Sequence, residues 1–169
     1  MQIMDDFLLD DTWNDFSQSR RWNKPHTSFL KIDSTPKDLF DKIAFNIWGW
    51  YIKKYKPQNV VGIETWINRA EGNTKEPLPW HQDRDEAHFN NTGENVHPMA
   101  GIVLYGHKSI PTGGYLEIQR EHGSELIEPV PNRLIVFDSS VWHRVTPMTS
   151  GTRLTLASNL WDRHPKPWR

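Results

Sequence analysis

The chain has 169 residues, of which 36% are apolar and 24% charged, and this suits one globular domain (residues 1–169) with a sizeable core. It contains no cysteine, so disulfides and thiolate ligands are excluded, and any metal must be bound by histidine and carboxylate. The formal net charge of −1 makes nucleic acid an unexpected partner. No stretch approaches the roughly 20 apolar residues of a membrane span, and residues 1–11 lack the features of a signal peptide. We therefore expect a cytoplasmic protein without a membrane partner; the sequence predicts no oligomeric state.

The N-terminal third is predicted to form a helical support. Residues 1–33 carry apolar side chains without a regular period and are expected to form an extended or irregular lead-in. Ser34 or Thr35 can cap a helix and Pro36 suits its first turn, so a helix is predicted over about residues 36–55. The apolar positions of this helix keep the spacing of one buried stripe, formed by Leu39, Phe40, Ile43, Ile47, Trp50 and Tyr51. Such a helix should lie against the outside of a sheet.

The rest of the chain is typical of short strands separated by turns. Strands are predicted at residues 59–68, 99–105, 115–119, 125–130, 133–137, 141–145 and 153–160. Two polar loops, residues 69–79 and 84–98, have no periodicity and are either solvated connections or lids beside a site. The predicted fold is therefore mainly β, an antiparallel barrel or sandwich over residues 59–161, with residues 1–56 as its N-terminal support.

The strand predicted at residues 153–160 alternates between polar and apolar side chains. A turn centred near Met148 and Thr149 would pair it with residues 141–145 and place Arg153 roughly opposite Val145. The odd-numbered residues then share one face, which carries His143, Val145, Arg153, Thr155, Ala157 and Asn159. The opposite face carries Leu154, Leu156 and Leu160. One face is therefore predicted to line a site and the other to join the core.

The segment PWHQDRD carries His81 and Asp83, which are separated by one residue. On extended chain the side chains at i and i+2 point to the same side, so these two can bind one metal ion together. His143, on the polar strand face, supplies a third ligand. Two histidines and one carboxylate leave further positions of the metal open, as Fe(II) oxygen chemistry requires. The remaining histidines lack such spacing and are predicted to lie on the surface: His26, His88, His97, His107, His122 and His164.

Several motifs occur in an order that is typical of one enzyme family. They are His81-x-Asp83, the GGYLEI segment at 113–118, the RLIVFD segment at 133–138, His143, and Arg153 ten positions after His143. This order resembles the Fe(II)- and 2-oxoglutarate-dependent dioxygenases, and most of all their prolyl-hydroxylase-like branch. The resemblance covers roughly residues 60–161. It implies a double-stranded β-helix, the jelly-roll or cupin-type barrel, with the metal at its open mouth.

The same resemblance implies a role for each site residue. His81, Asp83 and His143 would be the catalytic metal ligands that hold Fe(II), with 2-oxoglutarate and O2 as co-substrates. Arg153 would bind the distal carboxylate of 2-oxoglutarate, because a guanidinium forms a bidentate pair with a carboxylate, and Tyr105 would donate a hydrogen bond to it. The walls of this pocket would come from Val103, Leu116 and Val145. The reaction would yield succinate and CO2 and hydroxylate an unactivated C–H bond.

The substrate is predicted more coarsely than the reaction. Relatives that act on peptidyl proline often carry a tyrosine on the strand before His-x-Asp and a tryptophan six residues after the arginine. Here that strand reads TWIN, and the second place holds Asn159, so the candidate substrate-binding residues are Trp66, Asn159 and Trp161. The first expectation is a protein or peptide side chain, prolyl among the candidates. The alternatives are a free amino acid or other small metabolite, a cupin-like metal-binding module without turnover, and a Zn(II) hydrolase.

Overall fold

The computed structural model describes residues 1–75 and 77–166, which form two main antiparallel sheets with helices on one side. The six-stranded sheet contains, in spatial order, β1 (Gln2–Met4), β9 (Leu134–Phe137), β5 (Ala100–Tyr105), β12 (Thr152–Trp161), β3 (Gly62–Glu71) and β2 (Thr27–Lys31). The four-stranded sheet contains β4 (Leu78–His81), β10 (His143–Val145), β7 (Leu116–Arg120) and β8 (Gly123–Ile127). The short strands β6 (Thr112–Gly113) and β11 (Met148–Ser150) pair separately. The fold is therefore mainly β, as predicted.

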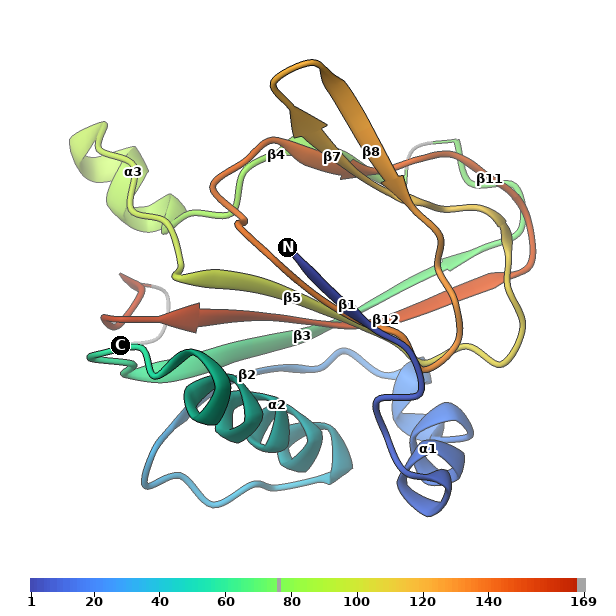
Figure 1. Cartoon of the computed structure of the whole chain (residues 1–169), viewed down its shortest axis with the longest axis horizontal. Coiled ribbons are helices and arrows are strands. Elements are labelled where there is room, and N and C mark those ends of the chain that lie inside the picture. The colour runs from blue at the N-terminus through green and yellow to red at the C-terminus, as the bar shows by residue number, and fades with distance from the viewer. Residues whose placement is uncertain (76, 167–169) are drawn as a thin grey trace.

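The six-stranded sheet separates two apolar cores. Figure 1 shows the four-stranded sheet on one side of it and helices α1 (Asp10–Ser17) and α2 (Leu39–Tyr55) on the other. The core on the helix side includes Ile43 and Ile47 of α2 together with Leu154, Leu156 and Leu160 of β12. The core between the sheets includes Val103, Tyr105, Leu116, Ile118, Ile127, Ile135 and Phe137. The alternation of β12 therefore divides its side chains as predicted, with the leucines in the core.

Helix α2 follows the predicted stripe but begins three residues later than predicted. Its N-cap is Asp38, whose side chain accepts a hydrogen bond from the backbone N–H of Asp41 at 3.0 Å. The expected caps, Ser34 and Thr35, precede the helix, because the aspartate satisfies the first free N–H groups instead. The C-terminal residue, Tyr55, agrees with the prediction.

Residues 1–33 contain more regular structure than the predicted extended or irregular lead-in. Besides α1, the segment contains a 3₁₀ turn at Arg20–Asn23 and two strands that extend the large sheet. β1 pairs with β9 and β2 pairs with β3, both antiparallel. These strands have only three and five residues, so their order comes from pairing with distant strands rather than from a local pattern.

The predicted hairpin between residues 141–145 and 153–160 was wrong. β10 pairs with β4 and β7, whereas β12 pairs with β3 and β5 in the other sheet. Between them the chain forms β11, which pairs with β6 and carries the chain from one sheet to the other. His143 and Arg153 therefore do not share a sheet face. They lie on different sheets and line the same cavity between these sheets.

The two polar loops contain more structure than predicted. β3 continues to Glu71, and residues 84–98 contain helix α3 (Glu86–Thr92), which is capped by the Asp85 side chain at the backbone N–H of His88, 2.8 Å away. The strand predicted at 125–130 begins earlier, at Gly123, and ends at Ile127. Among the described helices, none has the length and apolarity needed to span a membrane.

Candidate active site

Three side chains that can hold a metal converge at the open end of the four-stranded sheet. His81 ends β4 and His143 begins β10, and the antiparallel register places them directly opposite each other. Asp83 follows β4, with its Oδ1 3.6 Å from His81 Nε2 and its Oδ2 3.8 Å from His143 Nε2. The ligand atoms of all three residues lie within 4.8 Å of one another. This set of two imidazoles and one carboxylate fits a single divalent transition metal.

Backbone groups hold the two imidazole rings and the main chain of Asp83 in place. His81 Nδ1 donates to the Pro79 carbonyl at 2.8 Å, and His143 Nδ1 donates to the Val141 carbonyl at 2.8 Å. A carbonyl can only accept, so each ring carries its proton on Nδ1 and turns its Nε2 lone pair toward the cluster. The backbone N–H of Asp83 donates to the Ser139 carbonyl at 3.0 Å, which ties this ligand to the turn before β10. The ligand set is therefore held in place by the fold itself.

Burial shifts the pKa of Asp83 and of His143. It raises the pKa of the Asp83 carboxyl, while His81 and a hydrogen bond from Asn159 act in the opposite direction. Burial also lowers the pKa of His143 to about 4, although the hydrogen bond to Val141 opposes this change. His143 is therefore neutral at physiological pH, which is the form that binds a metal.

The lowered pKa of His143 predicts an acid-sensitive metal-free protein. A histidine that is neutral in the fold and protonates near pH 6.5 when unfolded favours the unfolded state as the pH falls from 6.5 to about 4. The shift corresponds to a loss of about 3 kcal/mol across that window. We expect His143→Gln to reduce the loss when urea unfolding is measured at pH 7 and pH 4.5, with the exposed His122→Gln as control. If wild type and His143→Gln lost the same unfolding free energy between pH 7 and pH 4.5, the assigned role of His143 in acid sensitivity would be wrong.

A narrow cavity runs between the sheets from the metal cluster to a buried arginine. Arg153, on β12, is 4% exposed, and its Nε donates to the Gly114 carbonyl at 3.0 Å and its Nη1 to Thr155 Oγ1 at 2.8 Å. A Cβ on Gly114, which has φ +70°, would lie 3.1 Å from Arg153 Cδ, so this glycine leaves room for the arginine. The predicted residues Leu116 and Val145 line the cavity with Val103, together with His81, Asp83, His143 and Arg153.

Tyr105 lies beside the arginine, although it does not itself line the cavity. The Arg153 guanidinium carbon is 5.1 Å from the centre of the Tyr105 ring. Within residues 1–75 and 77–166 the buried Tyr105 hydroxyl has no hydrogen-bond partner. Burial raises its pKa, with Arg153 opposing the change, so the hydroxyl stays protonated and can donate. A buried cation beside an unsatisfied donor is suited to an incoming carboxylate.

A second, open cavity of about 370 Å³ meets the same metal cluster from outside. It is lined by Pro25, His26, Thr27, Glu64, Trp66, Ile67, Asp83, Arg84 and Asn159. Trp66 and Asp83 line both cavities. Trp66 and Asn159, two of the three predicted substrate residues, therefore lie here. Trp161 lines neither cavity: it is 1% exposed, and its Nε1 donates to Glu64 Oε2 at 3.0 Å.

Sequence reasoning missed the contribution of the N-terminal segment to the open cavity. Pro25, His26 and Thr27 reach it because β2 pairs with β3, beside Trp66. The prediction that His26 and His107 lie on the surface was wrong, since they are 5% and 3% exposed. Their burial is compensated by specific contacts: Arg21 Nη2 donates to His26 Nδ1 at 2.9 Å, and His107 Nε2 lies 2.6 Å from the Pro129 carbonyl.

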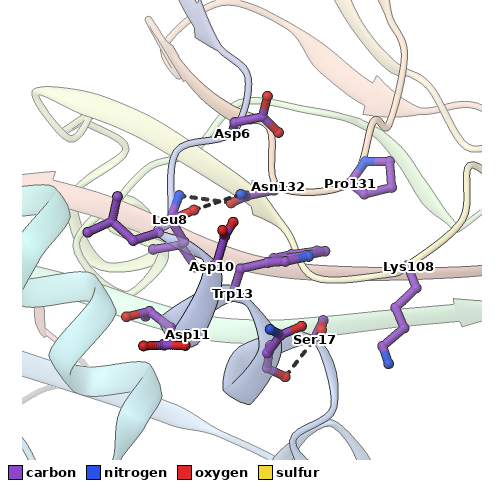
Figure 2. Close-up of a pocket in the computed structure, with 12 residues that line it drawn as sticks. Asp6, Leu8, Asp10, Asp11, Trp13, Ser17, Lys108, Pro131 and Asn132 are labelled. Carbon is purple, nitrogen blue, oxygen red and sulfur yellow. Dashed lines mark hydrogen bonds between the residues drawn. The ribbon is translucent and has the colours of Figure 1, made fainter.

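Two other features of the molecule lie outside the cluster of His81, Asp83 and His143. His26, Asp38 and Asp41 also approach one another, but the guanidinium of Arg21 already bonds His26 and Asp38 there. A larger cavity, of about 1120 Å³, lies beside α1 and contains none of the metal-cluster residues. Figure 2 shows that it is lined by Asp10, Asp11 and Trp13, with Asn132 bonded to the backbone of Leu8. The candidate metal ligands and the buried arginine therefore all lie at the cavity between the two sheets.

Comparison with known proteins agrees with this geometry. A model of the 2OG-Fe(II) oxygenase superfamily matches residues 65–161. A Pseudomonas putida prolyl-4-hydroxylase has a similar structure, with TM-score 0.66 and 19% identity over 96% of this chain and 92% of that chain. The viral collagen prolyl hydroxylase of Paramecium Bursaria Chlorella virus-1, in its 2OG complex, gives TM-score 0.55 and 14% identity over 94% and 93%. A Trichoplax adhaerens prolyl hydroxylase in complex with a hypoxia inducible factor peptide fragment has TM-score 0.59 and 13% sequence identity. The match covers 95% of this chain and 83% of that chain.

The structural similarities confirm the predicted double-stranded β-helix. No similar sequence was found among the curated proteins. The match to the superfamily model covers more than half of the chain and includes the His81, Asp83, His143 and Arg153 positions. This protein therefore belongs to the 2OG-Fe(II) oxygenase superfamily, whose members are dioxygenases that depend on Fe(II), 2-oxoglutarate and O2, and its fold is similar to that of prolyl hydroxylases.

Proposed function

We propose that His81, Asp83 and His143 hold Fe(II), and that Arg153 and Tyr105 bind the distal carboxylate of 2-oxoglutarate. The proposal rests on a single cavity that has a candidate metal site at one end and a buried cation at the other. One end has two imidazole nitrogens and a carboxylate, which suit Fe(II), and the other has a buried guanidinium beside an unsatisfied hydroxyl. A cupin-like module or a Zn(II) hydrolase would use the three ligands but would have no use for the buried cation.

Some residues of the site would bind the metal and the co-substrate, and others would exclude water from the cavity. When bound, Fe(II) with 2-oxoglutarate and O2 supplies the oxidant for a C–H bond of the substrate, and the co-substrate ends as succinate and CO2. Arg153 and Tyr105 fix one end of the co-substrate, while apolar walls keep water from the ion pair, which strengthens it. His81 and His143 keep their Nδ1 protons on backbone carbonyls, so neither ring can turn away from the metal.

We further propose that the substrate is a protein or peptide side chain, with prolyl as the first candidate. The open cavity of about 370 Å³ reaches Asp83 from the surface and presents Trp66, Pro25 and Ile67 as apolar walls. An open groove of this kind admits one side chain of a longer chain without burying the whole molecule. The similar Trichoplax adhaerens enzyme was solved with a peptide fragment, which supports the same substrate class.

The test is a comparison of peptides with free amino acids as activators of 2-oxoglutarate turnover. Purified protein with Fe(II), 2-oxoglutarate and air should form succinate faster when a mixture of proline-containing peptides is added. Mass spectrometry should then find a peptide that has gained one oxygen atom. Stimulation by free amino acids alone, with unmodified peptides, would favour the small-metabolite alternative.

Tyr105→Phe should give two effects of opposite sign. Removal of a buried hydroxyl without a partner should raise the unfolding free energy of the metal-free protein by about 1 kcal/mol. The same change should raise the KM for 2-oxoglutarate by about tenfold, because one charge-assisted hydrogen bond to its carboxylate is lost. Urea unfolding and succinate assays measure the two effects. A destabilised variant with an unchanged KM would show that Tyr105 serves packing alone.

A further inference from the structure

Asn159 contacts a metal ligand although it is not one itself. It lies on β12, paired with Glu64 of β3 and Gly101 of β5, and is 4% exposed. In the orientation of its amide that satisfies its neighbours, the nitrogen donates to Asp83 Oδ2 at 3.1 Å and to the Ser158 carbonyl at 3.1 Å. Sequence reasoning placed Asn159 among the substrate residues, but its amide donates a hydrogen bond to a carboxylate of the metal cluster.

We propose that Asn159 is a positioning residue, which holds the Asp83 carboxylate in the orientation that binds Fe(II). The inference rests on the proposed role of His81, Asp83 and His143 as metal ligands. An aspartate side chain can rotate about two bonds, and each rotation would carry its oxygens away from the two imidazoles. With Oδ2 held by Asn159, this rotation is restrained. Oδ1 then stays 3.6 Å from His81 Nε2, and Oδ2 stays 3.8 Å from His143 Nε2.

The backbone of the same residue is fixed by a second contact. The N–H of Asp83 donates to the Ser139 carbonyl at 3.0 Å, and Ser139 packs against β5 at Gly101. A Cβ on Gly101 would come within 2.7 Å of Ser139 Cβ, so only glycine allows the turn to approach β5 this closely. Gly101 and Asn159 are register partners. Side chain and backbone of Asp83 are therefore held by neighbouring points of one sheet.

The chemistry of the amide suits this role better than a charged donor would. An arginine or lysine would neutralise the carboxylate and weaken it as a ligand for a divalent cation. An amide donates a hydrogen bond and leaves the full negative charge on Asp83. Outer hydrogen-bond partners of this kind typically contribute 10–100-fold, roughly, to metal affinity.

The direct test measures binding of Mn(II) alone to the metal-free protein, so that no turnover is needed. Asn159→Leu keeps the size of the side chain and removes the donor, and Asn159→Ala serves as a second variant without a donor. Both should raise the Kd for Mn(II) by at least about tenfold. The control is Thr65→Val, which removes a buried hydroxyl from the strand next to β12, where it bonds the Ala157 carbonyl at 3.1 Å. It should leave the Kd unchanged.

A coupling measurement distinguishes positioning from a general structural effect. In an Asp83→Ala background, Asn159→Leu should cause no further loss of affinity for Ni(II), which binds strongly to imidazoles. A further loss of tenfold or more would overturn the proposal, since Asn159 would then act without Asp83. An unchanged Mn(II) Kd in both Asn159 variants would overturn it as well.

The outcomes also separate this inference from the proposed function. If wild-type protein binds Mn(II) and His81→Ala loses binding, the metal centre stands, and the Asn159 variants alone decide the inference. If His81→Ala binds Mn(II) as well as wild type does, the metal centre itself is wrong and the role of Asn159 falls with it. A substrate-binding role for Asn159 would instead raise the substrate KM and leave the Mn(II) Kd at its wild-type value.

Discussion

Asp83→Asn is expected to abolish Fe(II)-dependent succinate formation, by a factor of about 1,000 or more, which is about 4 kcal/mol. The variant replaces the single anionic ligand with a neutral amide of the same size, so that only two imidazoles remain to hold the metal. The metal-free fold should respond in the opposite direction. Burial raises the pKa of this carboxyl, so its charge at neutral pH favours the unfolded state, and removal of that charge should raise the unfolding free energy.

Two measurements check this expectation. Succinate formation is followed with Fe(II) and 2-oxoglutarate, and urea unfolding is followed at pH 7 without metal. Asp15→Asn, which neutralises an exposed aspartate on α1, is the control for loss of one negative charge. Turnover within tenfold of wild type in Asp83→Asn would show that this carboxylate is not a metal ligand.

Arg153→Lys should raise the KM for 2-oxoglutarate by about 100-fold, with a much smaller effect on turnover at saturation. Lysine keeps the positive charge but loses the planar fork that pairs with a carboxylate through two parallel hydrogen bonds. It also cannot reproduce both bonds that Nε and Nη1 make to Gly114 and Thr155. The steady-state dependence of succinate formation on 2-oxoglutarate concentration measures the effect.

The control for Arg153→Lys is Arg69→Lys, on the exposed end of β3. Arg69 pairs with Glu71 at the surface, so the change should alter neither KM nor turnover. If Arg153→Lys also kept the wild-type KM, the buried cation would not bind the co-substrate. Another group would then have to receive its distal carboxylate.

The approach of His81 and Asp83 to each other was predictable because it depends on local chain geometry. The spacing of His81 and Asp83 on extended chain already places both side chains on one side, and the alternation of β12 already separates Arg153 from the leucines. The structure keeps both relations. Which strands pair was not predictable in the same way. A tight turn near Met148 suggested a hairpin, whereas the observed pairing of β11 with β6 depends on residues far away in the sequence.

The missed parts of the site depend on contacts between distant segments. β2 forms by pairing with β3, which is distant in the sequence. The local sequence therefore gave no signal that Pro25, His26 and Thr27 line a cavity. The role of Asn159 depends on the meeting of β12 with the chain after β4, which no sequence spacing shows. The cap at Asp38, by contrast, was visible in the sequence, since aspartate is a favoured N-cap residue.

The most direct test of the account is an anaerobic titration of the metal-free protein with Fe(II) and 2-oxoglutarate. Chelation of Fe(II) by the keto acid should produce a weak visible charge-transfer band that is absent with either component alone. The band should disappear in His143→Ala and require much more 2-oxoglutarate in Arg153→Lys. A protein that binds Fe(II) at these three residues but forms no band with 2-oxoglutarate would contradict the assignment of the buried arginine and tyrosine as the co-substrate site.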